Sequence, residues 1–137
     1  MEKASVKEVL NGFNDTKYVT PRGVGKIVEA GSNDNGSWIK FSNGAMICRL
    51  NSTRKDIGIT QAYGPLYLGH YTWVYPQPFK NADVSVCCSQ FLWGTSASWG
   101  SALSPGSQSV LLRAYDYYSR AAGTDTNICA IAVGWWK

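Results

Sequence analysis

Residues 38–50 read Trp38-Ile39-Lys40-Phe41-Ser42-Asn43-Gly44-Ala45-Met46-Ile47-Cys48-Arg49-Leu50. Two apolar runs flank Asn43-Gly44, and an Asn-Gly pair in that setting is the strongest short-range signal of a β-hairpin. A turn cluster, residues 32–36, comes directly before the first run. This stretch therefore predicts two antiparallel strands joined by a tight turn.

Four further runs have the apolar, β-branched and aromatic composition of strands, namely residues 66–75, 84–93, 109–117 and 127–136. Stretches rich in Ser, Gly and Pro lie between them, and two of these, residues 95–98 and 104–107, predict loops. Six or so strands with no convincing helix indicate an all-β domain, an antiparallel β-sandwich or small barrel.

The composition agrees with a single β-rich domain. The chain has 137 residues, of which 45% are hydrophobic, 13% aromatic and only 16% charged, which excludes a disordered tail. The formal net charge is +4 without a basic run, so nucleic acid is not expected as a partner. No apolar segment approaches the roughly 20 residues that span a bilayer, and residues 1–4 lack a signal-peptide pattern. Membrane insertion and Sec-type export are therefore not expected.

The first 31 residues differ in composition from the rest. Of the aromatic residues only Phe13 and Tyr18 lie there. Two helix-start signals occur in the same stretch, the capping-box spacing Ser5-Val6-Lys7-Glu8 and the pair Thr20-Pro21. We expect residues 1–31 to form a short, mostly helical or irregular segment and residues 32–137 to form the β domain. A segment with so few large apolar residues cannot close a core alone, so it is either a linker or one layer of an assembly that needs copies of itself.

Both parts of the chain resemble bacteriophage tail fibres. The opening segment is similar to the short repeat of tail-fibre shafts in Ala4-Ser5, Glu8-Val9, Gly12, Asn14-Asp15-Thr16-Lys17 and Val19-Thr20-Pro21. The rest resembles the tail-fibre C-terminal domain, a β-sandwich at the fibre tip, in Asn35-Gly36-Ser37-Trp38-Ile39-Lys40-Phe41, Asn43-Gly44-Ala45-Met46-Ile47-Cys48, Tyr71-Thr72-Trp73-Val74-Tyr75-Pro76, Phe79 and the ending Ala130-Ile131-Ala132-Val133-Gly134-Trp135-Trp136-Lys137. Two positions depart from the family pattern: Val24 replaces the more usual Leu, and Trp135 replaces a polar or basic residue.

The resemblance implies a homotrimeric, non-enzymatic receptor-binding tip of a phage, prophage or phage-like bacteriocin fibre. Such a tip follows an upstream shaft, is assembled in the cytoplasm of the bacterial host and lies at the distal end of the virion tail fibre. Its implied partner is a bacterial surface glycan such as lipopolysaccharide or capsule. Two alternatives stay open: a catalytic tip that degrades polysaccharide, and a structural cap that only holds three chains in register.

Residues that carry chemistry are sparse. Glycoside hydrolysis needs two carboxylates at a controlled separation, and after residue 31 there are five Asp, no Glu and no local pairing. We therefore expect no catalytic residue. His70 is the single imidazole; three copies on a trimer axis could hold a metal, but ordinary hydrogen bonding is the commoner role. No metal or other cofactor is expected.

The four cysteines lack the C-x-x-C spacing of zinc and redox sites. We expect free thiols, as in proteins made in a reducing compartment. Cys87 and Cys88 are adjacent in an expected strand, so their side chains should point to opposite faces.

Aromatic residues provide the candidate ligand-binding set. Tyr71, Trp73 and Tyr75 alternate and should share a packed strand face. Other rings stand beside loops of small polar residues, a setting that suits sugars, because a ring packs on the apolar face of a pyranose while polar neighbours orient its hydroxyls. These candidates are Trp93, Trp99, Tyr63, Tyr67, Tyr117 and Tyr118.

Overall fold

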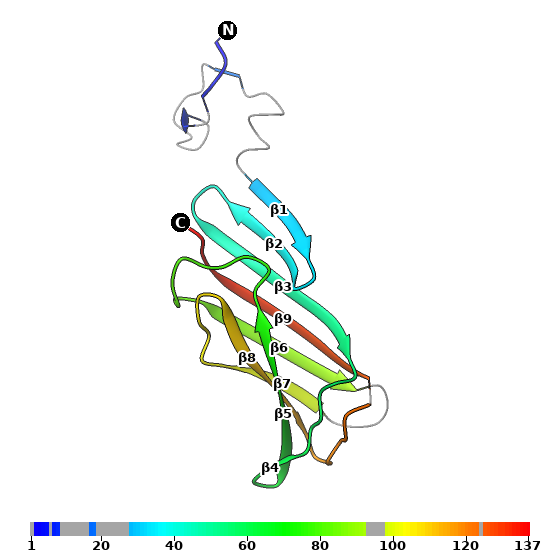
Figure 1. The fold of residues 1–137 in the computed structure, drawn as a ribbon. Helices are drawn as coiled ribbons and strands as arrows, with labels where there is room; N and C mark the ends of the chain where they lie inside the picture. Colours follow the sequence, from blue (N-terminus) through cyan, green and yellow to red (C-terminus); the bar gives the residue numbers. More distant parts are fainter. Residues whose placement is uncertain (1, 6, 9–16, 19–27, 93–97, 124) are drawn as a thin grey trace.

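The computed structural model describes residues 2–5, 7–8, 17–18, 28–92, 98–123 and 125–137 (Figure 1). These residues contain nine strands in two antiparallel sheets. One sheet has the order β1-β2-β3-β9-β6 and the other β4-β5-β8-β7. The strands are β1 (Val28–Asn33), β2 (Gly36–Phe41), β3 (Ala45–Arg54), β4 (Gln61–Tyr63), β5 (Leu66–Val74), β6 (Ser85–Leu92), β7 (Ser98–Leu103), β8 (Ser109–Asp116) and β9 (Thr126–Trp135).

The core lies between the two sheets. Met46 and Cys48 on β3 and Ile128 on β9 share one buried cluster with Trp73 on β5 and Leu112 on β8, and each is at most 1% exposed. Burial alternates along β3, β8 and β9, as expected when one face of each sheet packs inward. The all-β antiparallel prediction is confirmed, and its form is the two-sheet sandwich.

The expected hairpin at residues 38–50 is formed by β2 and β3. Ile39 pairs with Ile47 in an antiparallel register. Gly44 has a φ of 98° and donates its N–H to the carbonyl of Phe41 at 3.0 Å, so the turn uses the backbone freedom of glycine. Asn43 supports the turn because its Oδ1 accepts a hydrogen bond from the Ala45 N–H at 3.0 Å.

The four other expected strands appear as β5, β6, β8 and β9. Three further strands, β1, β4 and β7, were not expected from the sequence. The expectation of a loop at residues 95–98 is wrong at its end, because Ser98 begins β7; residues 95–97 lie outside the described residues. β1 crosses the composition boundary at residues 31–32.

In β9 the small residues point inward and the large ones outward. Ala130, Ala132 and Gly134 are buried, whereas Ile131 and Val133 are exposed by 49% and 44%. The interior requires small side chains here because Phe79 packs against Gly134, where an added Cβ would lie 2.9 Å from its ring. The consequence is an outer surface with exposed aliphatic groups.

The described N-terminal residues confirm the expected capping box. The Ser5 N–H donates to Glu8 Oε2 at 2.8 Å, and the Glu8 N–H donates to Ser5 Oγ at 3.3 Å. A hydrogen bond from Lys17 lowers the pKa of Glu8 to about 2. The second expected helix start, Thr20-Pro21, lies outside the described residues. Within the described ranges no helix has the length and apolar character needed to cross a membrane.

Candidate functional site

The outer face of the four-stranded sheet is organised in rows across its strands. Leu68 pairs with Tyr115, which pairs in turn with Trp99. The next row along the strands contains His70, Arg113 and Ser101. Directly paired residues share a sheet face, so these side chains all lie on the side away from Trp73 and the core.

Four rings gather at one end of this face, and we call them the aromatic cluster: Tyr63, Trp99, Tyr115 and Tyr117. Trp99 and Tyr115 are stacked, with centroids 5.8 Å apart and an interplanar angle of 15°. Tyr63 lies 6.1 Å from Tyr115, and Tyr117 lies 6.4 Å from Trp99 in an edge-on arrangement. Trp99 is 40% exposed, and Tyr63 and Tyr117 more than half, so the rings remain open to a ligand.

The cluster has a rigid base. Leu68 is only 2% exposed although it lies on this outer face, where it pairs directly with Tyr115. Ser101 Oγ donates a hydrogen bond to the Tyr115 hydroxyl at 3.1 Å. This bond and the nearby Arg113 guanidinium lower the pKa of Tyr115. The central ring is thus held by packing below and by a polar partner at its tip.

A buried carboxylate orders the chain beside the cluster. Asp116 is fully buried at the end of β8, and its Oδ1 accepts a hydrogen bond from the Tyr118 N–H at 2.9 Å. Its other oxygen accepts one from Arg120 Nε at 3.4 Å. The Arg120 backbone pairs with Ile59. The Asp116 side chain therefore fixes the turn that carries Tyr117 and Tyr118.

The sequence candidates occupy different positions. Trp99, Tyr63 and Tyr117 belong to the aromatic cluster. Tyr118 is 67% exposed outside it, with the Arg120 guanidinium 5.4 Å from the ring centre. Tyr67 packs against the buried core. Trp93 lies outside the described residues.

Three contributors to this face were not among the sequence candidates: Tyr115, Arg113 and Ser101. The available signal was the two-residue period of Arg113, Tyr115 and Tyr117 along an expected strand. The matching period of Trp99 and Ser101 is hard to see in the sequence, because the small polar residues 95–98 directly before Trp99 favour a loop.

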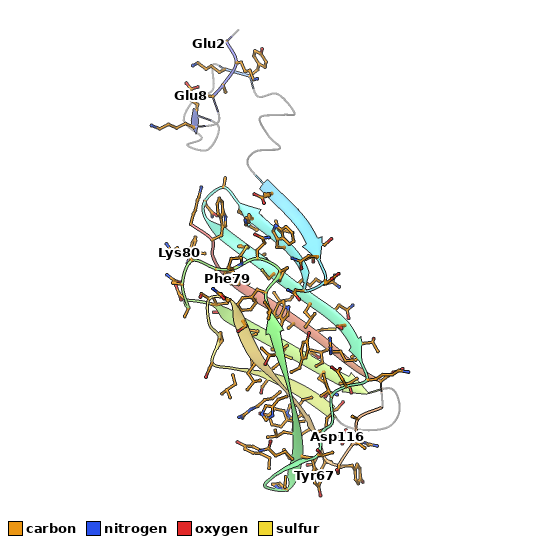
Figure 2. The ribbon with its side chains drawn as sticks, viewed as in Figure 1. Glu2, Glu8, Tyr67, Phe79, Lys80 and Asp116 are labelled. Atoms are coloured by element: carbon orange, nitrogen blue, oxygen red, sulfur yellow. The ribbon has the colours of Figure 1, made fainter. Side chains whose placement is uncertain are left out.

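The cluster lies far from the point where the chain enters the sandwich. Val28 begins β1 and pairs with Phe41, beside the Gly44 turn, whose carbonyl accepts a hydrogen bond from Trp136 N–H. The start of β1 and the C-terminus are therefore at one end (Figure 1). Figure 2 shows Tyr67 and Asp116 at the opposite end from Phe79 and Lys80, and Asp116 directly precedes Tyr117 of the cluster.

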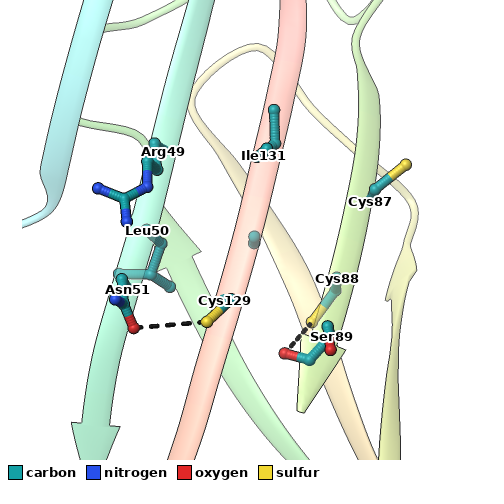
Figure 3. A pocket seen from close by; sticks show the side chains of 9 residues that line it. Arg49, Leu50, Asn51, Cys87, Cys88, Ser89, Cys129 and Ile131 are labelled. Carbon is teal, nitrogen blue, oxygen red and sulfur yellow. Dashed lines mark hydrogen bonds between the residues drawn. The ribbon is translucent and has the colours of Figure 1, made fainter.

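The outer face of the five-stranded sheet has a different character. We call it the aliphatic face: Ile39, Ile47, Ile131, Val133 and Trp135, whose exposed members are between 41% and 49% exposed. An apolar pocket beside it is lined by Arg49, Asn51, Cys87, Cys129 and Ile131 (Figure 3). Arg49 is the one charged residue at the outward positions of β2, β3, β6 and β9 in their described pairings.

The four thiols are free in the structure, as expected. Cys87 is exposed on the outer face, and Cys88 points to the inner side, where its Sγ would lie 2.9 Å from a Cβ at Gly100. The opposite orientations of this pair are confirmed. Burial raises the pKa of both Cys48 and Cys88 to about 11.

Comparison with known proteins gives structural neighbours only: neither the protein-family models nor the curated protein sequences contain a match. An N-truncated R1-type pyocin tail fibre has a TM-score of 0.58 and 17% sequence identity, over 85% of this chain and 97% of that chain. A P. aeruginosa R1 pyocin fibre comprising C-terminal residues 323–701 has a TM-score of 0.54 and 16% identity, over 85% of this chain and 32% of that one. The chain shares its fold with these pyocin tail-fibre fragments.

Proposed function

We propose that this chain is the tip of a phage or phage-like tail fibre and that its aromatic cluster binds a bacterial surface glycan. One observation carries the proposal: exposed, braced rings gather at the end of the sandwich opposite the entry of the chain. If a shaft precedes Val28, that end faces the host. The shared fold with pyocin tail-fibre fragments supports the same role.

The chemistry of the cluster suits a sugar. A pyranose offers an apolar face that packs on Trp99, while its hydroxyls can exchange hydrogen bonds with the Tyr63 and Tyr117 hydroxyls. The rings need little reorganisation because Leu68 and Ser101 already hold the central Tyr115. A preordered site loses less conformational entropy when it binds.

We also propose that the fibre tip is a homotrimer joined to an upstream shaft. The aliphatic face supports this part of the proposal, because monomeric proteins seldom expose a continuous apolar surface of this kind. Three chains that covered it would each also present one aromatic cluster, and several linked sites raise the overall affinity for a repeating polysaccharide.

Binding, rather than polysaccharide cleavage, is the better-supported activity. Three of the five aspartates after residue 31 are engaged by cations: Asp56 by Arg54, Asp116 by Arg120 and Asp125 by Lys55. A carboxylate held in an ion pair is poorly placed to act as a general acid.

The test is adsorption of the protein to intact cells and to the same cells stripped of surface polysaccharide. Glycan binding predicts strong adsorption to the intact cells only, with no release of reducing sugar from the isolated polysaccharide. Equal adsorption to both kinds of cell would contradict the proposal. Release of oligosaccharides would favour a catalytic tip, and absence of adsorption across a broad panel of bacteria would favour a purely structural cap.

A further inference from the structure

The row beside the aromatic cluster carries positive charge. Arg113 lies between His70 and Ser101 on the outer face. Arg113 and Tyr115 are two residues apart on β8, so their side chains emerge on the same face about 7 Å apart along the strand. A ligand that stacks on the aromatic cluster and extends about 7 Å along the strand therefore also reaches the Arg113 guanidinium.

Arg113 has no acidic partner in the described part of the chain, where the ion pairs involve other cations. Its Nε is buried and makes no hydrogen bond. The guanidinium hydrogen-bonds the Tyr115 side chain but has no carboxylate partner, and a guanidinium of this kind that is partly removed from water can still bind an oxyanion. The Ser101 and Tyr115 hydroxyls beside it add further hydrogen-bonding groups.

The described outward positions of this sheet include no acidic residue that would repel an anion. The outward positions of β4, β5, β7 and β8 in the paired registers carry Arg113 and His70 but no carboxylate. Asp116, the nearest acid in sequence, points into the interior, is fully buried and is paired with Arg120. The net charge of the whole chain, +4, acts in the same direction.

We propose that the site takes an anionic saccharide, whose ring stacks on Trp99 and whose carboxylate or phosphate oxygens meet Arg113. This inference rests on the proposed glycan-binding function and specifies the class of glycan. It assigns the two rows separate roles: the aromatic cluster supplies contact area, and Arg113 selects charge.

The test measures binding of three defined probes by calorimetry: an oligogalacturonate, the neutral galactose oligomer of the same linkage, and a galactose oligomer bearing one phosphate. Charge selection predicts that at least one anionic probe binds about tenfold or more tightly than the neutral one. Because the interaction is ionic, this preference should shrink as salt is raised. Comparing the carboxylate and phosphate probes identifies which anion the site prefers.

Arg113→Gln should abolish the preference for the anionic probe and leave the weak affinity for the neutral oligomer. Arg113→Lys keeps the charge and should retain most of the preference. Arg49→Gln is the matched control, because it removes the same charge from the opposite outer face. Thermal unfolding of each variant verifies that the sandwich is intact.

Equal affinity of the unmodified protein for charged and neutral probes would overturn the anionic assignment while leaving glycan binding in place. Loss of the preference in Arg49→Gln but not in Arg113→Gln would also overturn it, as would failure to bind either anionic probe. Failure of the proposed function itself is a separate result: equal adsorption to intact and stripped cells.

Discussion

The outer faces of the two sheets carry similar charge but different kinds of apolar side chain. On the four-stranded sheet, a cluster of rings that includes three tyrosines lies beside the row of Arg113, and the central Tyr115 hydroxyl accepts a hydrogen bond from Ser101. On the five-stranded sheet, Ile131 and Val133 are similarly exposed, but they have no polar atoms to offer. A sugar needs both a flat apolar surface and hydrogen-bonding groups, whereas a protein surface needs only matching apolar area. Exposure alone therefore does not distinguish a ligand site from a packing surface; the polar groups among the exposed side chains do.

Trp73→Ala should have the largest effect, because it removes the interior that supports both faces. Trp73 is fully buried, lies edge-on to Tyr75 and donates its Nε1–H to the Asn35 carbonyl at 2.8 Å. We expect a loss of about 3 to 5 kcal/mol in the free energy of unfolding, measured by denaturant titration. Val74→Ala, at the exposed neighbouring position, is the control. A loss below about 1 kcal/mol for Trp73→Ala would show that the core is elsewhere.

Ile131→Asp should show that the aliphatic face, and not the face with the aromatic cluster, forms the trimer contact. A carboxylate on the aliphatic face cannot be buried against another chain without a large desolvation cost. We expect light scattering to give the mass of one chain, 15.0 kDa, for this variant and a trimer for the unmodified protein. Leu103→Asp places the same charge on the other outer face and should leave the trimer unchanged. A trimer for Ile131→Asp and a single chain for Leu103→Asp would mean that the outer face of the four-stranded sheet forms the trimer contact instead.

The labelling rate of Cys87 should also show whether the outer face of the five-stranded sheet is covered, with a smaller effect than the change in mass. Burial raises the pKa of Cys48 and Cys88 to about 11, so at pH 8 only about one in a thousand of these thiols is the reactive thiolate, and the fraction increases as pH rises. Cys87 is exposed in the single chain. Its labelling should become slow when the proposed trimer covers the outer face of the five-stranded sheet. Labelling of Cys87 should then be several-fold faster in Ile131→Asp, as followed by mass spectrometry. Equal rates in both proteins would mean that this part of the face stays uncovered.

The fold was largely predictable because its signals are local. Asn43-Gly44 specified the β2–β3 hairpin through a turn that favours glycine. β7 escaped prediction because its inward residues are small: Gly100 and Ala102 lie where β6 approaches so closely that a Cβ on Gly100 would meet Cys88 Sγ. Packing between distant strands, which sequence patterns do not contain, imposed that composition.

The candidate site was only partly predictable. Exposure beside loops selected Trp99, Tyr63 and Tyr117, which the sheet brings together, but the same criterion selected Tyr67, whose place in the strand turns it toward the core. Register decides such cases, because a shift of one residue moves a side chain to the other face. The contribution of Arg113 depends on its pairing with His70 and Ser101, which precede it in the chain by 43 and 12 residues.

The most direct test of the division between the faces compares Trp99→Ala with Leu103→Ala. Both residues lie on the outer side of β7 and are similarly exposed, at 40% and 38%, but only Trp99 belongs to the aromatic cluster. Adsorption to intact cells is measured on samples whose mass and thermal unfolding match those of the unmodified protein. We expect Trp99→Ala to lose about 1 to 3 kcal/mol of binding per site, multiplied in effect across a trimer, and Leu103→Ala to adsorb normally. Normal adsorption by Trp99→Ala, or loss of trimer mass in that variant, would contradict the assignment of this face to glycan binding.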